Sequence, residues 1–436
     1  MNRLKRFTAL ALLAALLLTL TPVFAEEGFV EEEILLDETD PDAGLHAEET
    51  VTPDARSFTP AHGSPYEGQD PELNYWTLPM DITDEAAVWE VLMKPITVLN
   101  GKSFGQPEKA QIVLREEPDE AARGLGVCTC ETQGVHVLKK EGDWALIECY
   151  SSSFHNSKVI NWNTLIQGWV PSKYLKEITP NQSIGFVVDK LTQRLYVFRE
   201  GKLFTTLLVS TGVANPSQPY NETRSGEFLL TSKVGNFASD NMTCRMALRF
   251  NSGDLLHEVP YVYSRTDAGY KKQEVALGTR ASHGCIRVQR KKTPEGINMQ
   301  WIYEHHKKNT KFLVWEDWQG RQIAYPDDDT LLYYNPNKGE YYHSQETCYS
   351  TKKKFESFTY GELDDGHYAE LTRCPYCTPP LRKAEIDEIN ELHAIGGDHD
   401  PVLTEARLKC PMELKEWSKL KEEIDDQLKK QKKKKK

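Results

Sequence analysis

The sequence predicts a mainly β protein built from several small domains. At 436 residues the chain is long enough for roughly two to four of them. Short β-favouring runs separated by turn residues follow one another from about residue 96. From residue 183 apolar and polar residues alternate along strand-length runs, as they do in a half-buried sheet. Helical spacing of apolar residues is confined to the C-terminal end.

The N-terminus has the pattern of a secretory signal peptide over residues 1–25. Three basic residues precede the apolar run Phe7–Leu20, and small residues lead to a cleavage position after Ala25. This run is shorter than the roughly 18 residues of a membrane-spanning helix, and no later run is long enough. We therefore expect a secreted protein of the cell envelope or cell wall, with no transmembrane helix in the mature chain.

An acidic linker is expected over residues 26–80. Residues 26–55 contain twelve Asp or Glu and no Lys or Arg, which equals the formal charge of −12 of the whole chain. A segment this acidic and this poor in aromatic residues cannot bury enough surface to fold. The remaining chain is nearly neutral, so nucleic acid is not an expected partner.

The nine cysteines do not form the pattern of a disulfide scaffold. An odd number leaves at least one thiol for another use. Cys128, Cys130 and Cys149 are close in sequence and could supply one disulfide, but the connectivity is open.

Residues 85–178 are expected to form a compact β-barrel. Their closing piece, Gly168–Leu175, and the turn at Gly142–Ala145 resemble the end of a bacterial SH3-like domain. That resemblance implies a module that places a neighbouring enzyme on peptidoglycan. The alternative is a spacer barrel with no ligand of its own.

The segment Ser282–Arg287, with the sequence Ser-His-Gly-Cys-Ile-Arg, is the strongest candidate for chemistry. A cysteine beside a histidine and a glycine can present a thiolate in a tight turn that a carbonyl group approaches closely. Taken alone, the pair is equally compatible with a structural cysteine beside a surface histidine.

Four further pieces accompany this segment in order between residues 183 and 316. They are the string Val-x-Asp-x-x-x-Gln-x-Leu-Tyr-Val-Phe from Val187, the break Ser210–Gly212, the unit Thr223–Phe228, and His257. Together they resemble the L,D-transpeptidase catalytic domain, also called the YkuD domain. The resemblance implies a β-sandwich with its nucleophile in a cleft, acting on peptidoglycan stem peptides without a cofactor.

By this resemblance Cys285 is the nucleophile and His257 the base, supported by the backbone carbonyl of Glu258. The cysteine would form a thioester on the third residue of a stem peptide, release D-alanine and yield a 3→3 cross-link. A nearby imidazole is expected to lower the pKa of the thiol.

Three neighbours of the nucleophile have supporting roles in this scheme. His283 would position the thiolate or the incoming amine, and backbone N–H groups around Gly284 would hold the oxyanion. Ser282 and Arg287 are expected to bind substrate, Arg287 through a stem-peptide carboxylate. A structural ion pair is the alternative for Arg287.

The sequence separation of His257 and Cys285, 28 positions, is longer than is usual in the family. The extra residues, Tyr261–Lys271, are expected to form a longer loop over the cleft that affects substrate choice. Cys244 is expected in the core.

Three other functions remain open. Hydrolysis by an L,D-carboxypeptidase, or attachment of a protein to the wall, would use the same acyl-enzyme. A non-catalytic wall-binding protein would use only the flanking modules, although the retained histidine and complete motif favour an enzyme.

Residues 325–382 contain His343, Cys348 and the C-x-x-C pair Cys374 and Cys377. One imidazole and three thiols have the composition of a closed, tetrahedral structural zinc site. The arrangement resembles a small Cys/His β module at the ends of many bacterial exported proteins. A disulfide, reduced core thiols and a redox C-x-x-C are the alternatives.

The last segment, residues 383–436, is expected to be a helical, Lys-rich tail. Leu414, Trp417, Leu420, Ile424 and Leu428 recur at helical spacing, and seven of the last eight residues are lysine. The tail is expected either to be a solvated helix or to attract anionic wall polymers or lipid headgroups.

Overall fold

The computed structural model describes residues 82–151, 159–161, 163–213, 219–315, 322–337, 339–348, 351, 354–374, 377, 379–394 and 412–434. These ranges are mainly β, as the sequence predicts. None of their helices combines the length and apolar character needed to cross a membrane. The expected signal peptide (1–25) and acidic linker (26–80) lie outside the described residues, and the expected domain boundaries stay predictions.

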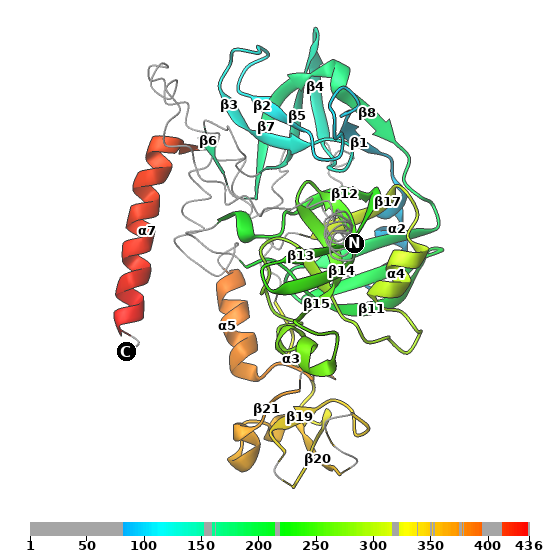
Figure 1. Ribbon diagram of the computed structural model, residues 1–436, viewed down its shortest axis with the longest axis vertical. Coiled ribbons are helices and arrows are strands. Elements are labelled where there is room, and N and C mark those ends of the chain that lie inside the picture. The colour runs from blue at the N-terminus through cyan, green and yellow to red at the C-terminus, as the bar shows by residue number, and fades with distance from the viewer. Residues whose placement is uncertain are drawn as a thin grey trace, which may run out of the picture. The chain divides into compact units, whose positions relative to one another are not determined.

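The largest element is a nine-stranded sheet with the order β12-β17-β9-β10-β11-β16-β15-β14-β13. Figure 1 labels its strands β11 to β15 and β17. Two neighbouring pairs are parallel, β15 with β16 and β17 with β9, and the rest are antiparallel. The strands are β9 (Ile184–Asp189), β10 (Arg194–Arg199), β11 (Lys202–Ser210), β12 (Gly226–Leu230), β13 (Ser232–Ser239), β14 (Met242–Asn251), β15 (Asp254–Val262), β16 (Ile286–Val288) and β17 (Thr310–Trp315).

The two ends of this sheet fold over each other. Phe228 on β12, at one edge, packs against Phe250 on β14 near the other edge, with ring centroids 5.3 Å apart. Phe250 also packs against Phe312 of β17 at 5.0 Å. All three rings are fully buried in one hydrophobic core. This is the sandwich-like packing that the sequence predicts for the region.

Two helices accompany the sheet, α3 (Asp267–Val275) and α4 (Met299–His305). The side chain of Thr266 caps α3 by accepting a hydrogen bond from the backbone N–H of Gly269. The expected long loop at Tyr261–Lys271 is thus only partly a loop, because β15 extends to Val262 and α3 begins at Asp267. The apolar ring of Tyr270 is buried beneath the helix, which anchors it to the sheet.

A five-stranded antiparallel sheet with the order β3-β2-β7-β5-β4 occupies the expected barrel region. Its strands are β2 (Gln111–Arg115), β3 (Gly124–Thr129), β4 (His136–Glu141), β5 (Trp144–Ser151) and β7 (Thr164–Pro171). The assignment to the SH3-like family stays a prediction. Cys128, Cys130 and Cys149 are buried here as free thiols, so the disulfide that their spacing allowed is not formed.

Three short elements border this region. β1 (Ile96–Leu99) and β8 (Leu175–Ile178) form an antiparallel pair. The preceding helix, α2 (Glu85–Met93), was not expected from the sequence. Its residues Val88 and Leu92 are one helical turn apart and pack in one cluster with Leu313 of the nine-stranded sheet.

The C-terminal region begins with a four-stranded sheet in the order β20-β18-β19-β21. Its strands are β18 (Leu331–Tyr334), β19 (Tyr341–His343), β20 (Glu356–Thr359) and β21 (Thr372–Arg373). Only six buried hydrophobic side chains form the described core of this sheet. The helix α5 (Lys383–Ala394) follows.

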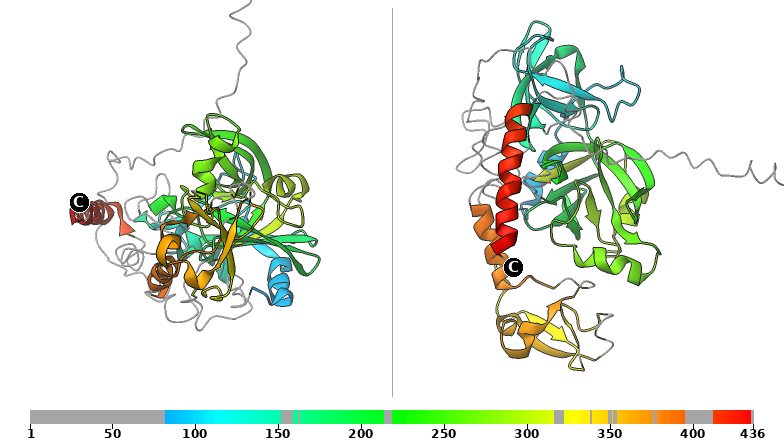
Figure 2. Two further views of the ribbon diagram at one scale, coloured as in Figure 1. Left: turned by 90° about the horizontal axis from the view of Figure 1, so that it is seen from below. Right: turned by 60° about the vertical axis from the view of Figure 1, so that its left-hand side comes forward.

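The expected helical tail is present as α7 (Leu414–Lys434), a single uninterrupted helix in Figure 2. It is more than a solvated helix, because Trp417 is buried in the core of the five-stranded sheet. The two residues before it, β22 (Met412–Glu413), pair with β6 (Val159–Ile160). The apolar face of the helix therefore packs against another part of the chain. Lys429 and Lys430, near its C-terminal end, are exposed.

Candidate active site

The site lies where β15 and β16 run parallel. The register of this pair places His257 opposite Arg287. Cys285 directly precedes β16 and lies two residues before Arg287, so its side chain is on the same face of the sheet as that of His257. The Cys285 sulfur lies 3.9 Å from the carbonyl oxygen of Gly253 at the start of β15. The fold thus places the two residues that the sequence predicts as nucleophile and base on, and directly before, two neighbouring strands.

The turn before Cys285 depends on Gly284. Its φ of +119° lies in a region that side chains disfavour, and a Cβ atom there would be 2.6 Å from a carboxylate oxygen of Asp254. The hydroxyl of Ser282 donates to the carbonyl oxygen of Cys285 and accepts from the N–H of Gly284. Ser282 is buried and helps to shape the turn, while its expected contact with substrate stays a prediction.

A second backbone segment supports the same turn. The hydroxyl of Thr223 accepts a hydrogen bond from the N–H of Gly212 and donates one to the carbonyl of Gly284, both at 2.8 Å. Gly212 also forms a parallel bridge with Ser282. A Cβ atom on Gly212 would be 1.9 Å from the carbonyl oxygen of Asn221, so this close approach requires glycine.

The imidazole of His257 is held in one orientation. Its Nδ1 lies 2.7 Å from the carbonyl oxygen of Glu258, as the resemblance to the L,D-transpeptidase domain implies. A carbonyl only accepts, so Nδ1 has the proton and the Nε2 lone pair of the neutral ring is left to act as a base. The edge-to-face contact with Phe237, at 5.4 Å between centroids, fixes the plane of the ring.

The pKa shifts of the two candidate groups, His257 and Cys285, leave both of them neutral at neutral pH. Burial, with a smaller contribution from Arg287, lowers the pKa of His257 to about 4, despite the opposing hydrogen bond to Glu258. Burial raises the pKa of Cys285 to about 12, and the charge of Asp254 adds to this. The expectation that the imidazole lowers the thiol pKa is therefore wrong for the resting site, because desolvation dominates both groups.

The residue that orients His257 is itself fixed by two contacts. The carboxylate of Glu258 accepts hydrogen bonds from Arg245 at 3.1 Å and from the hydroxyl of Tyr270 at 2.9 Å. Tyr270 belongs to α3, and Arg290 ties that helix down through ion pairs with Asp267 and Glu274. The extra residues Tyr261–Lys271, which the sequence predicts as a loop over the cleft, thus help to position His257 through Tyr270 and Glu258.

A buried ion pair flanks the thiol on its other side. Asp254 lies 2.6 Å from Arg224, and the side chains of both are largely buried. Burial raises the pKa of the Asp254 carboxyl group, while Arg224 opposes that change. Neither residue was singled out from the sequence, because their proximity to Cys285 depends on the hairpin between β14 and β15.

The remaining predicted residues are placed as follows. His283 is exposed at the turn, two residues before Cys285. Arg287 is buried and donates a hydrogen bond to the side chain of Gln273 on α3 at 3.0 Å. Cys244 is buried in the sheet, as expected. The roles of His283 and Arg287 toward substrate stay predictions.

A buried lysine beneath this turn was missed by sequence reasoning. The amino group of Lys190 donates to Glu222 at 2.7 Å, and to the carbonyl of Thr223 and the hydroxyl of Ser225 at 3.1 Å. The side chain of Gln193 also holds this region through both Lys190 and Thr211. Gln193 belongs to the motif that starts at Val187, and this was the only feature of the sequence that pointed to these hydrogen bonds.

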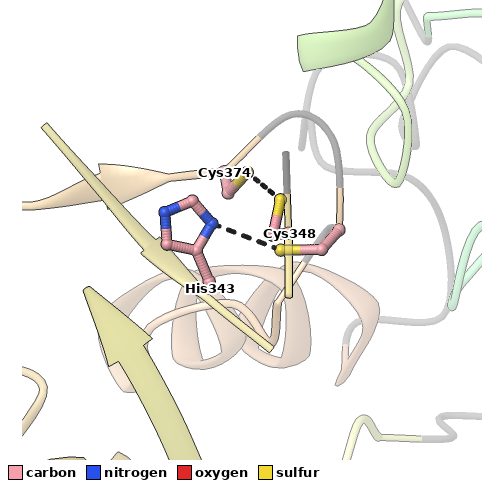
Figure 3. Close-up of side chains that lie close together, drawn as sticks. His343, Cys348 and Cys374 are labelled. Atoms are coloured by element: carbon pink, nitrogen blue, oxygen red, sulfur yellow. Dashed lines mark hydrogen bonds between the residues drawn. The ribbon is translucent and has the colours of Figure 1, made fainter. Parts of the chain in front are cut away.

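The second group of predicted residues also comes together. His343, Cys348, Cys374 and Cys377 place one ligand atom each within 4.8 Å of one another, and Figure 3 shows three of these side chains turned toward a common point. The cluster has the donor set and the closure of a structural metal site.

Residues 184–314 match the YkuD family model, described as the L,D-transpeptidase catalytic domain. No curated protein matches the chain. Several solved structures are similar at low identity. A fused Zn-dependent amidase/peptidase/peptidoglycan-binding domain-containing protein from Clostridium acetobutylicum ATCC 824 is 21% identical, with 30% of this chain and 51% of that chain covered and a TM-score of 0.22.

An L,D-transpeptidase from Stackebrandtia nassauensis is 23% identical, with 30% of this chain and 55% of that chain covered and a TM-score of 0.22. An L,D-transpeptidase from Mycobacterium smegmatis is 16% identical, with 51% of this chain and 91% of that chain covered and a TM-score of 0.24. The chain thus spans about half the length of the first two of these structures.

Proposed function

We propose that this protein is an L,D-transpeptidase that forms 3→3 cross-links between peptidoglycan stem peptides through a thioester on Cys285. The observation that supports this most directly is the hydrogen bond from His257 Nδ1 to the Glu258 carbonyl, on the strand beside the cysteine. It leaves Nε2 as an acceptor on the face where the thiol lies. The match of residues 184–314 to the YkuD model supports the same reaction class.

The first half-reaction begins from a neutral thiol and a neutral imidazole. The Cys285 sulfur attacks the carbonyl carbon of the third stem residue while His257 Nε2 takes the thiol proton. Collapse of the tetrahedral intermediate breaks the C–N bond, and His257 returns the proton to the amine of the departing D-alanine. Proton transfer coupled to attack fits a site in which neither group is charged at rest.

The second half-reaction regenerates the thiol. The side-chain amine of a second stem attacks the thioester, the C–S bond breaks, and the amine proton passes through His257 to the Cys285 sulfur. The amide that is cleaved supplies the free energy of the amide that is made, so the scheme needs no cofactor. Water as acceptor would give an L,D-carboxypeptidase, and a protein amine would give wall attachment.

Several groups are assigned to the transition state and the substrate. Because the N–H of Gly284 points to the Ser282 hydroxyl, the N–H of Cys285 is the main backbone donor for the oxyanion. The exposed His283 is proposed to position the thiolate or the acceptor amine. Arg287 approaches the stem carboxylate by exchanging its contact with Gln273.

The protein is proposed to act outside the cytoplasm, in the cell envelope. The signal-like sequence of residues 1–25 supports export, and the β domain at 85–178 is proposed to place the enzyme on peptidoglycan. The Lys-rich end of the tail is proposed to contact anionic wall polymers.

Intact-mass analysis of the purified protein tests the nucleophile. With a carbapenem or with tetrapeptide muropeptides, the wild-type protein is expected to gain one acyl group on Cys285, and Cys285→Ala is expected to gain none. Cys149→Ala, which removes a buried free thiol from the five-stranded sheet, is the matched control and should acylate normally. Muropeptide products then identify the acceptor.

Each outcome discriminates between functions. A new dimer with a 3→3 linkage supports transpeptidation, whereas only a tripeptide product identifies a carboxypeptidase. Acylation of Cys285→Ala, or no adduct on a folded wild-type protein with either reagent, would overturn the proposal and leave a wall-binding protein.

A further inference from the structure

Two of the distances among the four ligand atoms of the Cys/His cluster match the edges of a tetrahedron around one metal ion. The sulfurs of Cys348 and Cys374 are 3.7 Å apart, and the sulfur of Cys377 is 3.5 Å from Nδ1 of His343. A tetrahedral zinc ion with Zn–S bonds of about 2.3 Å and Zn–N bonds of about 2.05 Å requires edges of about 3.8 Å and about 3.6 Å for these pairs.

The backbone builds this arrangement from three separate positions. β19 and β21 are parallel neighbours that pair Tyr342 with Arg373, so the next step along each strand sets His343 beside Cys374. The third ligand, Cys348, follows a turn that is closed by a hydrogen bond of 3.2 Å from its backbone N–H to the carbonyl oxygen of Gln345. Strand pairing and this turn therefore bring residues that are distant in sequence together.

The surroundings fit a bound thiolate centre. The N–H of Ser344 points to the sulfur of Cys377 at 3.4 Å, as N–H groups do around metal-bound thiolates. Three thiolates and a neutral imidazole around Zn²⁺ leave a net charge of −1. The half-buried guanidinium group of Arg373 lies close enough to Cys374 and Cys377 to interact with their charges and offset this net charge.

We propose that His343, Cys348, Cys374 and Cys377 bind one structural zinc ion, with His343 coordinating through Nδ1. Binding replaces three thiol protons, which are released to solvent, by one divalent cation. The ligand set is complete and mostly buried, which leaves no position for a substrate or a reactive water molecule. The ion is thus structural, and it compensates for a core of only six described side chains.

Native mass spectrometry of the full-length wild-type protein tests the site. About one zinc ion per chain is expected after purification or after addition of equimolar zinc, and Cys374→Ser should retain less than about a tenth of this. Cys149→Ala, the buried thiol outside the cluster, should keep the full zinc content. Removal of zinc by a chelator should lower the melting temperature of the wild-type protein but not of Cys374→Ser.

A second measurement covers a variant that fails to fold. Replacing zinc by cobalt(II) in the wild-type protein should give the intense visible bands of a tetrahedral site and thiolate charge-transfer absorption in the near ultraviolet. A wild-type protein that binds neither metal, and whose denatured mass is lower by two hydrogens, contains a disulfide in place of the site. That result, or unchanged zinc content in Cys374→Ser, would overturn the proposal.

Discussion

Two regions of this protein combine histidine with cysteine, and they differ in what the imidazole Nδ1 faces. At His257 the Nδ1–H group is bound to a backbone carbonyl, and Cys285 lies directly before the neighbouring strand. At His343, Nδ1 faces sulfur, and three thiols share the site. The first arrangement leaves a free lone pair that can accept a proton. The second directs all four donors at one point.

The comparison shows that residue types alone do not separate a nucleophile from a metal ligand. Cys285 stands in a turn that only glycine can form, where the chain leaves room for a carbonyl group. Cys374 follows a strand whose neighbour supplies the histidine. Four substitution or titration experiments test this contrast.

The largest effect is expected from exchanging the two histidines for glutamine separately. His257→Gln should lower the rate of acylation by about 10²- to 10⁴-fold, because the general base is lost, and leave the zinc content unchanged. His343→Gln should lose zinc and acylate within about twofold of the wild-type rate. Stopped-flow acylation and metal analysis measure both. Loss of acylation in His343→Gln with the catalytic domain still folded would show that the two sites are coupled.

The ionisation of Cys285 gives the next effect. With a pKa raised by burial to about 12, the thiolate fraction should rise tenfold per pH unit, so alkylation by iodoacetamide should accelerate about 100-fold from pH 7 to pH 9. Peptide mass mapping isolates Cys285 from the other thiols. A rate already at its plateau near pH 7 would indicate a thiolate–imidazolium pair instead.

The ionisation of His257 is tested by the rate of carbapenem acylation at acid pH. His257, with a pKa lowered to about 4, is neutral above that pH and can accept the thiol proton. Acylation should therefore persist down to about pH 5 and fall as the pH drops through about 4, because a protonated imidazole has no free lone pair. A midpoint near 6.5, the ordinary value for histidine, would contradict the burial of the ring.

The smallest effect concerns the orientation of the base. Tyr270→Phe removes one of two hydrogen bonds to Glu258 and should lower the maximal acylation rate about 3- to 10-fold, with the half-saturating concentration unchanged. Tyr261→Phe, whose ring packs on Tyr270 at 5.3 Å, is the matched control. An unchanged rate with only a lower melting temperature would assign Tyr270 to packing alone.

Much of the fold follows from local patterns that the sequence contains. Alternation along Arg194–Phe198 predicted a strand, and the observed β10 runs one residue further, from Arg194 to Arg199. The periodicity of Leu414, Trp417 and Ile424 predicted a helix, found as α7. What the pattern did not contain was the partner of that helix. Trp417 is buried in the core of a sheet more than 240 residues away in sequence, and no local preference encodes such a contact.

The sequence by itself determined the candidate nucleophile, the candidate base with its carbonyl partner, and the four residues of the Cys/His cluster, because these depend on residue type and order. Only the tertiary structure decided their electrostatic state. Burial makes the Cys285 thiol and the His257 imidazole neutral, and contacts from Asp254 and Tyr270 set their surroundings. Desolvation and distances between strands depend on the packing of distant segments, and such packing is a property of the folded chain.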